Sequence, residues 1–480
     1  MKSISIRGAL ASLSLSMLLS SLGTSIANVG LPTLAAALSA SFQQVQWVVL
    51  AYLLAITALI VSVGRLGDII GRRRLLLIGI AVFTVASFLC ALAASLWLLI
   101  AARALQGIGA AIMMALTMAL VSEAVPKAKM GSAMGLLGTM SAIGTSLGPT
   151  LGGFLIANLG WQAIFLVNVP LGVLAIGLAH RFLPKDCREK RVDRAVFDVL
   201  GTLVLVLTLL AYALAMTLGR GSFGPLNTAL LLVAMVGAGV FVFVERTAES
   251  PLVRLTIFRN LQLSAGFAMS MLVTTVVMAT LVVGPFYLTG ALALNATSVG
   301  LVMSAGPLVA ALAGVPAGRW VDGLGAHRST TLGLIAMLTG ACILPAVPTG
   351  FGAFGYIVPL VVITAGYALF QAANNTAVMS NIATPQRGVV SGLLGLSRNL
   401  GLITGASVMG AVFAFGSASN DVLQAQPEAI AQGMRLTFVV AAGLILVALA
   451  IGAVSKIVSR SPDRAVLKNG ATVVKTTCLR

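Results

Sequence analysis

The sequence predicts an all-α integral membrane protein with fourteen transmembrane spans, arranged as two six-helix bundles plus two extra helices. Three observations predict this class. Of the 480 residues, 59% are hydrophobic and only 9% are charged, whereas soluble domains carry about 25% charged residues. Apolar runs alternate with short polar breaks, and each run is near the roughly 20 residues that a helix needs to cross a bilayer. The two halves of the chain also contain the same motifs.

The apolar runs divide the chain into four parts. Their centres lie near Ser20, Ala55, Phe83, Ala110, Ser146, Gly172, Thr208, Val236, Thr274, Leu308, Ala336, Ile363, Leu402 and Leu444. We expect an N-terminal six-helix bundle over residues 1–180, two linker spans with basic cytoplasmic loops over 181–260, a C-terminal six-helix bundle over 261–456 and a cytoplasmic tail over 457–480. A cleaved signal peptide is disfavoured, because the first apolar stretch is too long for the core of one.

Basic residues gather in alternate loops, which predicts the orientation. The formal net charge is +18, from 30 basic and 12 acidic residues. One set of loops holds nearly all Lys and Arg, while the other holds only Arg220 and Arg435. Since cytoplasmic loops are enriched in Lys and Arg, we expect both termini in the cytoplasm and the protein in a bacterial-type cytoplasmic (inner) membrane. The basic residues form no compact domain, which argues against a nucleic-acid partner.

Two motifs recur in the second half of the chain. The loop after the second span, Gly64–Arg74, and the loop after the tenth, Gly318–Arg328, both fit G-R-x-x-D-x-x-G-x-x-R. The glycine pattern that starts at Gly135 in span 5 recurs from Gly392 in span 13, at nearly the same displacement. Parallel halves of this kind are typical of transporters that rock around a site at the membrane midplane.

Further motifs follow in order along the chain. They are Gln46–Leu54, Arg103–Gly109, Gly144–Gly153, Trp161–Pro170 and Pro251–Asn260. With the repeated loop, they resemble the fourteen-span drug:proton antiporter branch of the major facilitator superfamily over nearly the whole chain. The resemblance implies the major facilitator fold and a multidrug efflux transporter that exports small amphipathic compounds by proton antiport and alternating access. A proton-coupled importer of small organic solutes on the same fold is the alternative.

The repeated loop supplies coupling and gating candidates. They are Arg65, Asp68 and Arg72, with Asp322 in the second copy. A carboxylate at a helix end can cap a helix N-terminus and pair with guanidinium groups. The resemblance implies that the loop latches the two halves in the outward-facing state and breaks on switching. The alternative is a solvated cluster that only fixes topology.

The glycine pattern of span 5 supplies three more candidates, Gly144, Gly148 and Pro149. Glycines leave only hydrogens on one face, so a neighbouring helix can approach closely, and the proline adds a bend. We expect a hinge here, which is compatible with ordinary tight packing. Ala406 stands at the corresponding place in the second half, so we expect the halves to differ mechanically.

Two arginines lie inside predicted spans, Arg103 in span 4 and Arg398 in span 13. Each would cost on the order of 3 kcal/mol at the bilayer centre if it faced lipid, so both should point into a wet or paired interior. The resemblance implies a role in proton coupling for Arg103. For Arg398, a substrate cavity and hydrogen bonding between helices remain open.

The chain departs from the resembling antiporters in span 1. Those that expel lipophilic cations usually have an aspartate where this chain has Gly23. The remaining acidic residues are expected near the cytoplasmic side or in an outer loop, and Glu123 lies near the cytoplasmic end of span 4. A cation in a low dielectric needs a compensating negative charge, so we expect a neutral, zwitterionic or anionic substrate. The proton carrier is then Glu123, Asp68 or the substrate itself.

Polar and aromatic residues inside spans are candidates for substrate binding. They are Asn28, Trp47, Tyr52, Gln106, Gln371, Asn374, Asn375 and Arg398. The alternative for each is that it satisfies a neighbouring helix. The pair Asn374 and Asn375 is favoured, because adjacent amides inside a span are costly unless they are used.

The sequence also limits the protein's chemistry and partners. His180 and His327 are the only histidines, so neither a metal cluster nor a histidine-based catalytic triad is expected. We therefore expect no enzyme activity and no cofactor. The expected partners are a small-molecule substrate, protons and the lipid bilayer, with the protein working as a monomer.

Overall fold

The computed structural model describes residues 6–124, 130–183, 198–218, 224–248, 255–380, 387–417 and 425–477, and these are almost entirely helical. The N-terminal half contains α1 (Ile6–Val29), α2 (Leu31–Ala37), α3 (Phe42–Val45), α4 (Trp47–Ile70), α5 (Arg72–Ala91), α6 (Leu96–Ala124), α7 (Met130–Leu159), α8 (Ala163–Leu166) and α9 (Asn168–Phe182). The hairpin of α10 (Val199–Thr217) and α11 (Pro225–Thr247) follows.

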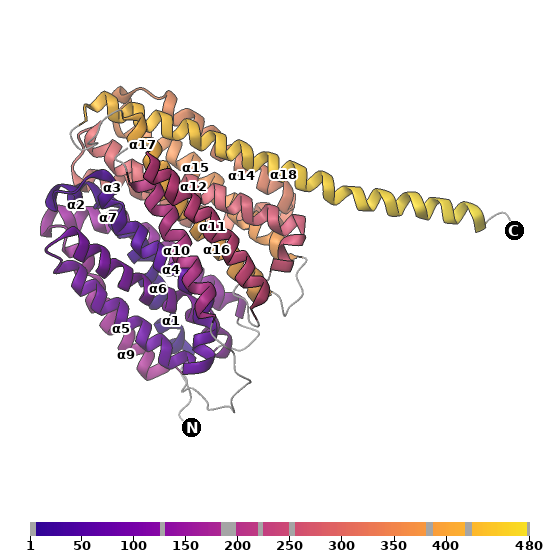
Figure 1. Cartoon of the computed structure of the whole chain (residues 1–480), viewed down its shortest axis with the longest axis horizontal. Coiled ribbons are helices and arrows are strands. Elements are labelled where there is room, and N and C mark those ends of the chain that lie inside the picture. The colour runs from indigo at the N-terminus through magenta and orange to yellow at the C-terminus, as the bar shows by residue number, and fades with distance from the viewer. Residues whose placement is uncertain are drawn as a thin grey trace.

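The C-terminal half follows. It contains η2 (Leu255–Arg259), α12 (Leu261–Gly290), α13 (Ala296–Leu324), α14 (Ala326–Ala346), η3 (Thr349–Phe351), α15 (Gly352–Ser380), α16 (Arg387–Thr404), the π-helical turn η5 (Gly405–Met409), α17 (Gly410–Gly416) and α18 (Pro427–Thr477). The last helix has 51 residues and runs well beyond the body of the molecule (Figure 1).

Within the described residues, thirteen helices are long and apolar enough to cross a membrane. Their number and composition confirm the predicted all-α membrane fold. The remaining expected span, centred at Ser146, falls on the 30-residue helix α7, which is not among the thirteen. The count of fourteen spans therefore stays a prediction, as does the division of the chain near residues 180 and 260.

The repeated loop folds in the same way in both halves. Helix α4 meets α5 at Gly71, and α13 meets α14 at Gly325, with φ angles of 102° and 82°. Only glycine adopts such angles readily, because it has no Cβ. We call the side of the molecule that holds these two junctions the basic face, and the side that holds α2, α3 and α17 the opposite face.

The two halves meet near the opposite face. In Figure 1 the bundles converge at the end that carries α2, α3 and α17, and they diverge towards the other end. A Cβ added at Gly153 of α7 would lie 2.9 Å from Cα of Gly300 in α13. The hydroxyls of Thr150 and Ser304 on the same two helices share a hydrogen bond. Such backbone contact between helices requires small residues at the crossing point.

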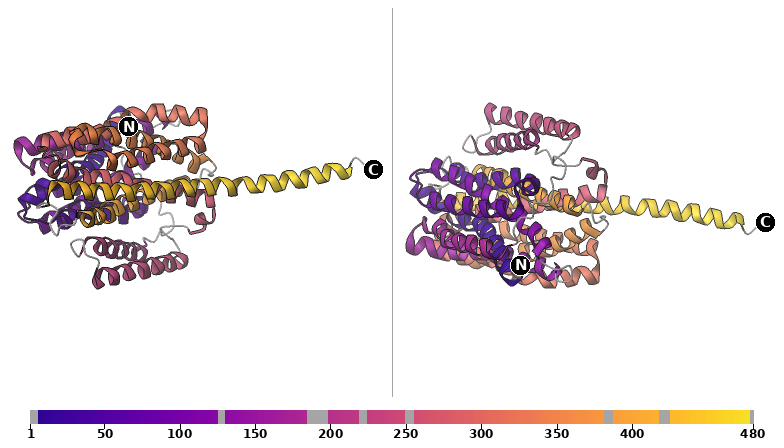
Figure 2. Two further views of the ribbon diagram at one scale, coloured as in Figure 1. Left: turned by 90° about the horizontal axis from the view of Figure 1, so that it is seen from above. Right: turned by 90° about the horizontal axis from the view of Figure 1, so that it is seen from below.

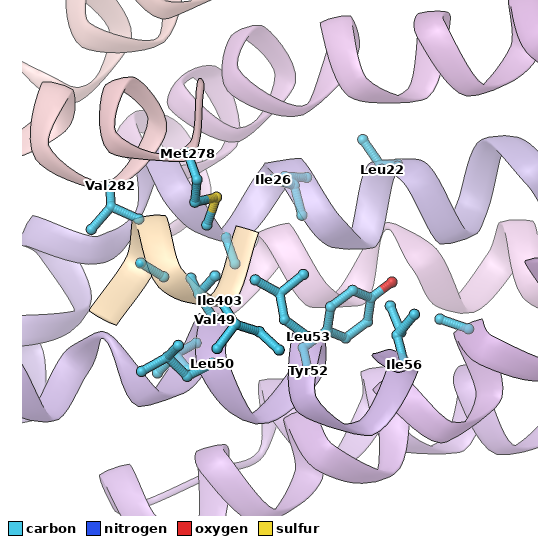
Figure 3. Close-up of a cluster of buried hydrophobic side chains, with 14 of the residues drawn as sticks. Leu22, Ile26, Val49, Leu50, Tyr52, Leu53, Ile56, Met278, Val282 and Ile403 are labelled. Carbon is cyan, nitrogen blue, oxygen red and sulfur yellow. The ribbon is translucent and has the colours of Figure 1, made fainter. Parts of the chain in front are cut away.

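Apolar side chains complete this interface. The ring of Phe42 in α3 lies 4.6 Å from that of Phe286 in α12 and 5.3 Å from that of Phe413 in α17, measured between centroids. Figure 3 shows a cluster in which Ile26 and the α4 residues near Leu53 lie beside Met278 and Val282 of α12 and Ile403 of α16. The core therefore continues from one bundle into the other.

The α10–α11 hairpin lies to one side of the two bundles (Figure 2). Between the described side chains, the hydrogen bonds that attach α10 to α4 come from hydroxyl and indole groups. Thr202 shares a 3.1 Å hydrogen bond with Ser62 of α4, and Trp47 Nε1 donates to Thr217 Oγ1 at 3.0 Å. Helix α11 is largely exposed, as expected for a helix that faces lipid.

Candidate functional site

Arg103 of α6 lies at the centre of a fully buried polar cluster in the N-terminal bundle. Its Nε donates to the backbone oxygen of Val48 at 2.8 Å. Its Nη1 donates to the backbone oxygen of Gly23 at 3.1 Å and to Gln106 Oε1 at 2.5 Å. The guanidinium carbon lies 4.1 Å from the centroid of the Tyr52 ring, a cation–π distance. Arg103 therefore ties α1 and α4 to its own helix.

The groups around the cluster extend it to a fourth helix. Gln106 Nε2 donates to Ser87 Oγ of α5 at 2.7 Å, and Tyr52 Oη donates to the backbone oxygen of Ser20 at 2.8 Å. Together these bonds connect α1, α4, α5 and α6. The cluster thus holds the N-terminal bundle together from inside.

All hydrogen-bond acceptors of Arg103 are neutral. They are two backbone carbonyls and one amide, and Arg103 Nη2 has no hydrogen-bond partner among the described residues. The described carboxylates belong to Asp198, Glu245, Asp322 and Glu428, and all four lie at or near helix ends. The buried positive charge is therefore stabilised by dipoles and a ring face, with no carboxylate beside it among these residues.

A second arginine forms a neutral pair in the C-terminal bundle. Arg398 of α16 is half-buried. When the amide of Gln371 is oriented with its oxygen towards Arg398, this oxygen accepts from Nη1 at 3.1 Å and from Nη2 at 3.2 Å. The backbone oxygen of Arg398 accepts from Thr274 Oγ1 of α12 at 3.2 Å. The pair therefore joins α15 to α16, and its positive charge also faces an uncharged partner.

The span-5 glycines pack α7 against α1. A Cβ at Gly144 would lie 2.5 Å from the backbone oxygen of Leu18, and one at Gly148 would overlap Ser25 Oγ. Ser25 Oγ also donates to the backbone oxygen of Gly144 at 3.3 Å. Pro149 is buried within α7, and its backbone oxygen lies at the Gly300 crossing. The tight packing is present, while the hinge role stays a prediction.

The predicted substrate-binding residues fall into separate groups. Tyr52 and Gln106 belong to the Arg103 cluster, and Gln371 belongs to the Arg398 pair. Trp47 anchors the α10–α11 hairpin. Asn28 is buried on α1, where its Nδ2 donates to the backbone oxygen of Thr24 at 3.2 Å. The structure thus does not bring all eight candidates to one pocket.

The two adjacent amides of α15 differ in their surroundings. Asn374 is only 2% exposed, and its Nδ2 donates to the backbone oxygen of Gly266 in α12 at 3.1 Å. It lines a cavity near the basic face, away from the contacts between the bundles. Asn375 is half-buried one position further along the same helix. Their roles in binding stay predictions.

Several coupling candidates lie outside the described side chains, namely Arg65, Asp68 and Glu123. Of the others, Arg72 begins α5 and Asp322 is exposed near the end of α13. Next to Arg72, Arg73 Nη2 donates to the backbone oxygen of His180 in α9 at 2.5 Å. This bond lies within the N-terminal half, so the latch between the halves stays a prediction.

Sequence reasoning did not find the hydroxyl groups that complete these clusters. Ser87, Ser25 and Thr202 each bond to a neighbouring helix or lie opposite a glycine. Serine and threonine are common in membrane helices, where they often bond to their own backbone, so their type alone carries no signal. Only the helix packing identifies which of them connect helices.

The chain matches the family model described as Major Facilitator Superfamily over residues 13–406 and 263–477. It is 30% identical to "Riboflavin transporter RibZ" of Clostridioides difficile, over 90% of this chain and 93% of that protein. It is 32% identical to "Multidrug resistance protein Stp" of Mycobacterium tuberculosis, over 81% of this chain and 72% of that protein.

Solved structures share the fold. A bacterial homolog of the human lysosomal transporter Spinster superposes with a TM-score of 0.66 at 15% identity, covering 95% of this chain and 97% of that one. The nucleoside transporter NupG superposes with a TM-score of 0.65 at 14% identity, covering 93% of this chain and 99% of that one. At such identities the likeness concerns the fold alone.

Proposed function

Because the chain belongs to the major facilitator superfamily, we propose that it exports a small amphipathic compound by proton antiport and alternating access. Like its relatives, the protein is a multi-pass membrane transporter and not an enzyme. Relatives named for multidrug resistance and for riboflavin transport support an amphipathic cargo. We further propose that it works as a monomer in a bacterial-type cytoplasmic membrane, with both termini in the cytoplasm.

The substrate is neutral, zwitterionic or anionic in this proposal. The observation that carries it is the neutral environment of Arg103, whose described hydrogen-bond acceptors are two backbone carbonyls and Gln106. Arg398 likewise faces the amide of Gln371. A lipophilic cation entering this interior would meet two positive charges and no described carboxylate between them, which a low dielectric makes unfavourable.

Arg398 is the group that contacts the substrate in this proposal. It is half-buried, so ligand can reach it, and its partner Gln371 is neutral, so its charge is not already neutralised there. A carboxylate or an electron-rich ring of the substrate would replace the amide as acceptor. A carboxylate would form the stronger bond, because both partners would then be charged and two parallel N–H···O bonds could form.

In this proposal the group that carries the proton lies outside the Arg103 cluster. That cluster contains no described carboxylate, and an arginine stays charged in proteins. The proton is therefore carried by Asp68 or Glu123, which the sequence puts near the basic face, or by the substrate itself. The contacts between the bundles near the opposite face support a conformation that opens towards the basic face.

The test is transport in proteoliposomes with an imposed pH gradient, with and without an uncoupler. The panel contains riboflavin as a neutral compound, fluorescein as an anion and ethidium as a cation. We expect gradient-driven transport of the anion or the neutral compound, and about tenfold slower anion transport in Arg398→Gln. Arg435→Gln removes an equal charge from an exposed position and serves as the matched control.

Three outcomes would count against the proposal. Transport of ethidium alone would contradict the charge argument. Anion transport that is equally slow in Arg398→Gln and Arg435→Gln would remove Arg398 from the site. Accumulation in the same direction as proton flow, and not against it, would favour the importer on the same fold.

A further inference from the structure

A cavity of about 350 Å³ lies inside the C-terminal bundle, at the ends of α12, α14, α15 and α18 that reach the basic face. Gln262 and His327, which line it, are exposed, so ligand can reach it from that side. It contains neither member of the Arg398–Gln371 pair. This cavity is therefore distinct from the site proposed for the transported compound.

The described lining of the cavity is basic. Lys456 of α18 and His327 of α14 belong to it, and its described residues include no carboxylate. Helix α14 begins at Ala326, which also lines it, so amides of the first turn lie at its edge. A helix N-terminus carries a partial positive charge and donates hydrogen bonds to anions. A lysine and a helix N-terminus thus both bring positive potential to this cavity, and the His327 ring adds a hydrogen-bonding group.

A buried amide adds a donor to the wall of the cavity. Asn374 is only 2% exposed, and one N–H of its Nδ2 donates to the backbone oxygen of Gly266. Its second N–H has no hydrogen-bond partner among the described residues. An amide so deeply buried is costly unless it is used. An acceptor oxygen within the cavity would satisfy it.

The rest of the wall is apolar, with Met269, Leu334, Val378 and Leu449 among the lining residues. Two glycines leave room for the cavity. A Cβ at Gly266 would lie 2.5 Å from Val378 Cγ2, and one at Gly452 would lie 3.3 Å from Met269 Sδ. The cavity therefore combines donors and positive charge with an apolar wall, a combination that suits an amphiphile with an anionic head.

We propose that this cavity binds the phosphate group of a phosphate ester with a net negative charge and thereby clamps α14 and α18 together. A phosphate carries negative charge and several acceptor oxygens, so it can accept from Lys456, His327, Asn374 and the first turn of α14 at once. A phospholipid headgroup and a soluble phosphate ester share this chemistry. The site is independent of the transported compound.

The test measures thermal unfolding of the purified full-length protein in a neutral detergent. The ligands are phosphatidylglycerol, phosphatidylcholine and sn-glycerol 3-phosphate. At saturation we expect phosphatidylglycerol or sn-glycerol 3-phosphate to raise the unfolding midpoint by about 2 °C or more. A lipid source is indicated if only phosphatidylglycerol does so, and a soluble source if sn-glycerol 3-phosphate suffices.

Three variants locate the effect. Lys456→Gln removes the charge and should weaken binding about tenfold. Gly452→Leu fills the cavity, keeps Lys456 and should also abolish the shift. Arg328→Gln is the matched control, because it removes a charge from the same end of α14 at an exposed position that does not line the cavity.

Each outcome of these measurements either supports or overturns the proposed phosphate site. A shift that persists in wild type and Arg328→Gln, but is smaller in Lys456→Gln and lost in Gly452→Leu, supports the site. An equal shift in all four proteins would overturn it, because the ligand would then act on the surface in general. Equal shifts with phosphatidylcholine and phosphatidylglycerol, or no shift with any ligand, would overturn it as well.

Discussion

Arg103 Nη1 donates to the backbone oxygen of Gly23 at 3.1 Å, at the position where resembling cation exporters carry an aspartate. The glycine thus contributes its carbonyl in place of a carboxylate. A Cβ at position 23 would lie 3.1 Å from the Phe83 ring and from Tyr52 Oη. A side chain at position 23 would fit tightly, but it can be accommodated because the nearest atoms belong to side chains, which can move.

Gly23→Asp is expected to place a carboxylate beside the buried guanidinium. An ion pair in a low dielectric is strong when it is well formed, and the added negative charge should favour cationic cargo. We expect a measurable gain of ethidium transport in proteoliposomes. Gly23→Asn has nearly the same size without the charge, so equal ethidium transport by both variants would show that charge is not the cause.

Gln106→Leu should destabilise the N-terminal bundle. The amide oxygen accepts from Arg103 Nη1 and the amide nitrogen donates to Ser87 Oγ, so the change leaves a buried charge with one acceptor fewer. Loss of a hydrogen bond to a charged group costs about 1.5–3 kcal/mol. Thermal unfolding in detergent should show a lower midpoint, and Ser87→Ala should show a smaller decrease. An unchanged midpoint in Gln106→Leu would mean that water replaces the amide.

Gly325→Ala should destabilise the protein more than Gly323→Ala. Gly325 has a φ of 82°, while neither glycine has a neighbouring atom within 4 Å of an added Cβ. Backbone strain, and not crowding, therefore distinguishes the two. At a φ of 82° with a ψ of 152°, a residue with a Cβ costs on the order of 1–3 kcal/mol. Equal unfolding midpoints for the two variants would show that the junction changes its conformation freely.

The sequence predicted a loop at each of these junctions from the repeated motif, but it did not predict the backbone conformation of the glycine. Gly71 and Gly325 occupy the same position in the two copies, and both have positive φ. The span-5 glycines were predictable for a similar reason, since Gly144 and Gly148 lie one turn apart on one face of α7 and contact α1. Family membership and the all-α membrane fold followed from composition, apolar runs and ordered motifs.

Side-chain partners were not predictable in this way. The apolar runs place Arg103, Gln106 and Asn374 inside spans, but they do not show which neighbouring helix faces each one. Arg103 bonds to backbone carbonyls, which every residue type possesses, so no sequence signal marks Val48 or Gly23 as its partners. For the same reason the sequence predicted Asn374 as a substrate-binding candidate but did not indicate that it lines a cavity near the basic face.

The crossing of α7 and α13 provides a direct test of alternating access. A Cβ at Gly300 would lie 2.5 Å from the backbone oxygen of Pro149 and 3.0 Å from Cα of Gly153. Backbone atoms cannot move aside as a flexible side chain can, so Gly300→Ala should force the bundles apart near the opposite face. Gly314→Ala on the same helix is the matched control, because nothing lies within 4 Å of its added Cβ.

We expect Gly300→Ala to shift the population towards the state that is open at the opposite face. A cysteine introduced at Ser304, which bonds to Thr150 across the crossing, would report this shift by its rate of labelling with a membrane-impermeant maleimide. The rate should rise several-fold in Gly300→Ala and stay unchanged in Gly314→Ala. A change of 1 kcal/mol between the two states alters their ratio about fivefold, so even modest crowding is measurable. Equal labelling in both variants would mean that this crossing does not open during transport.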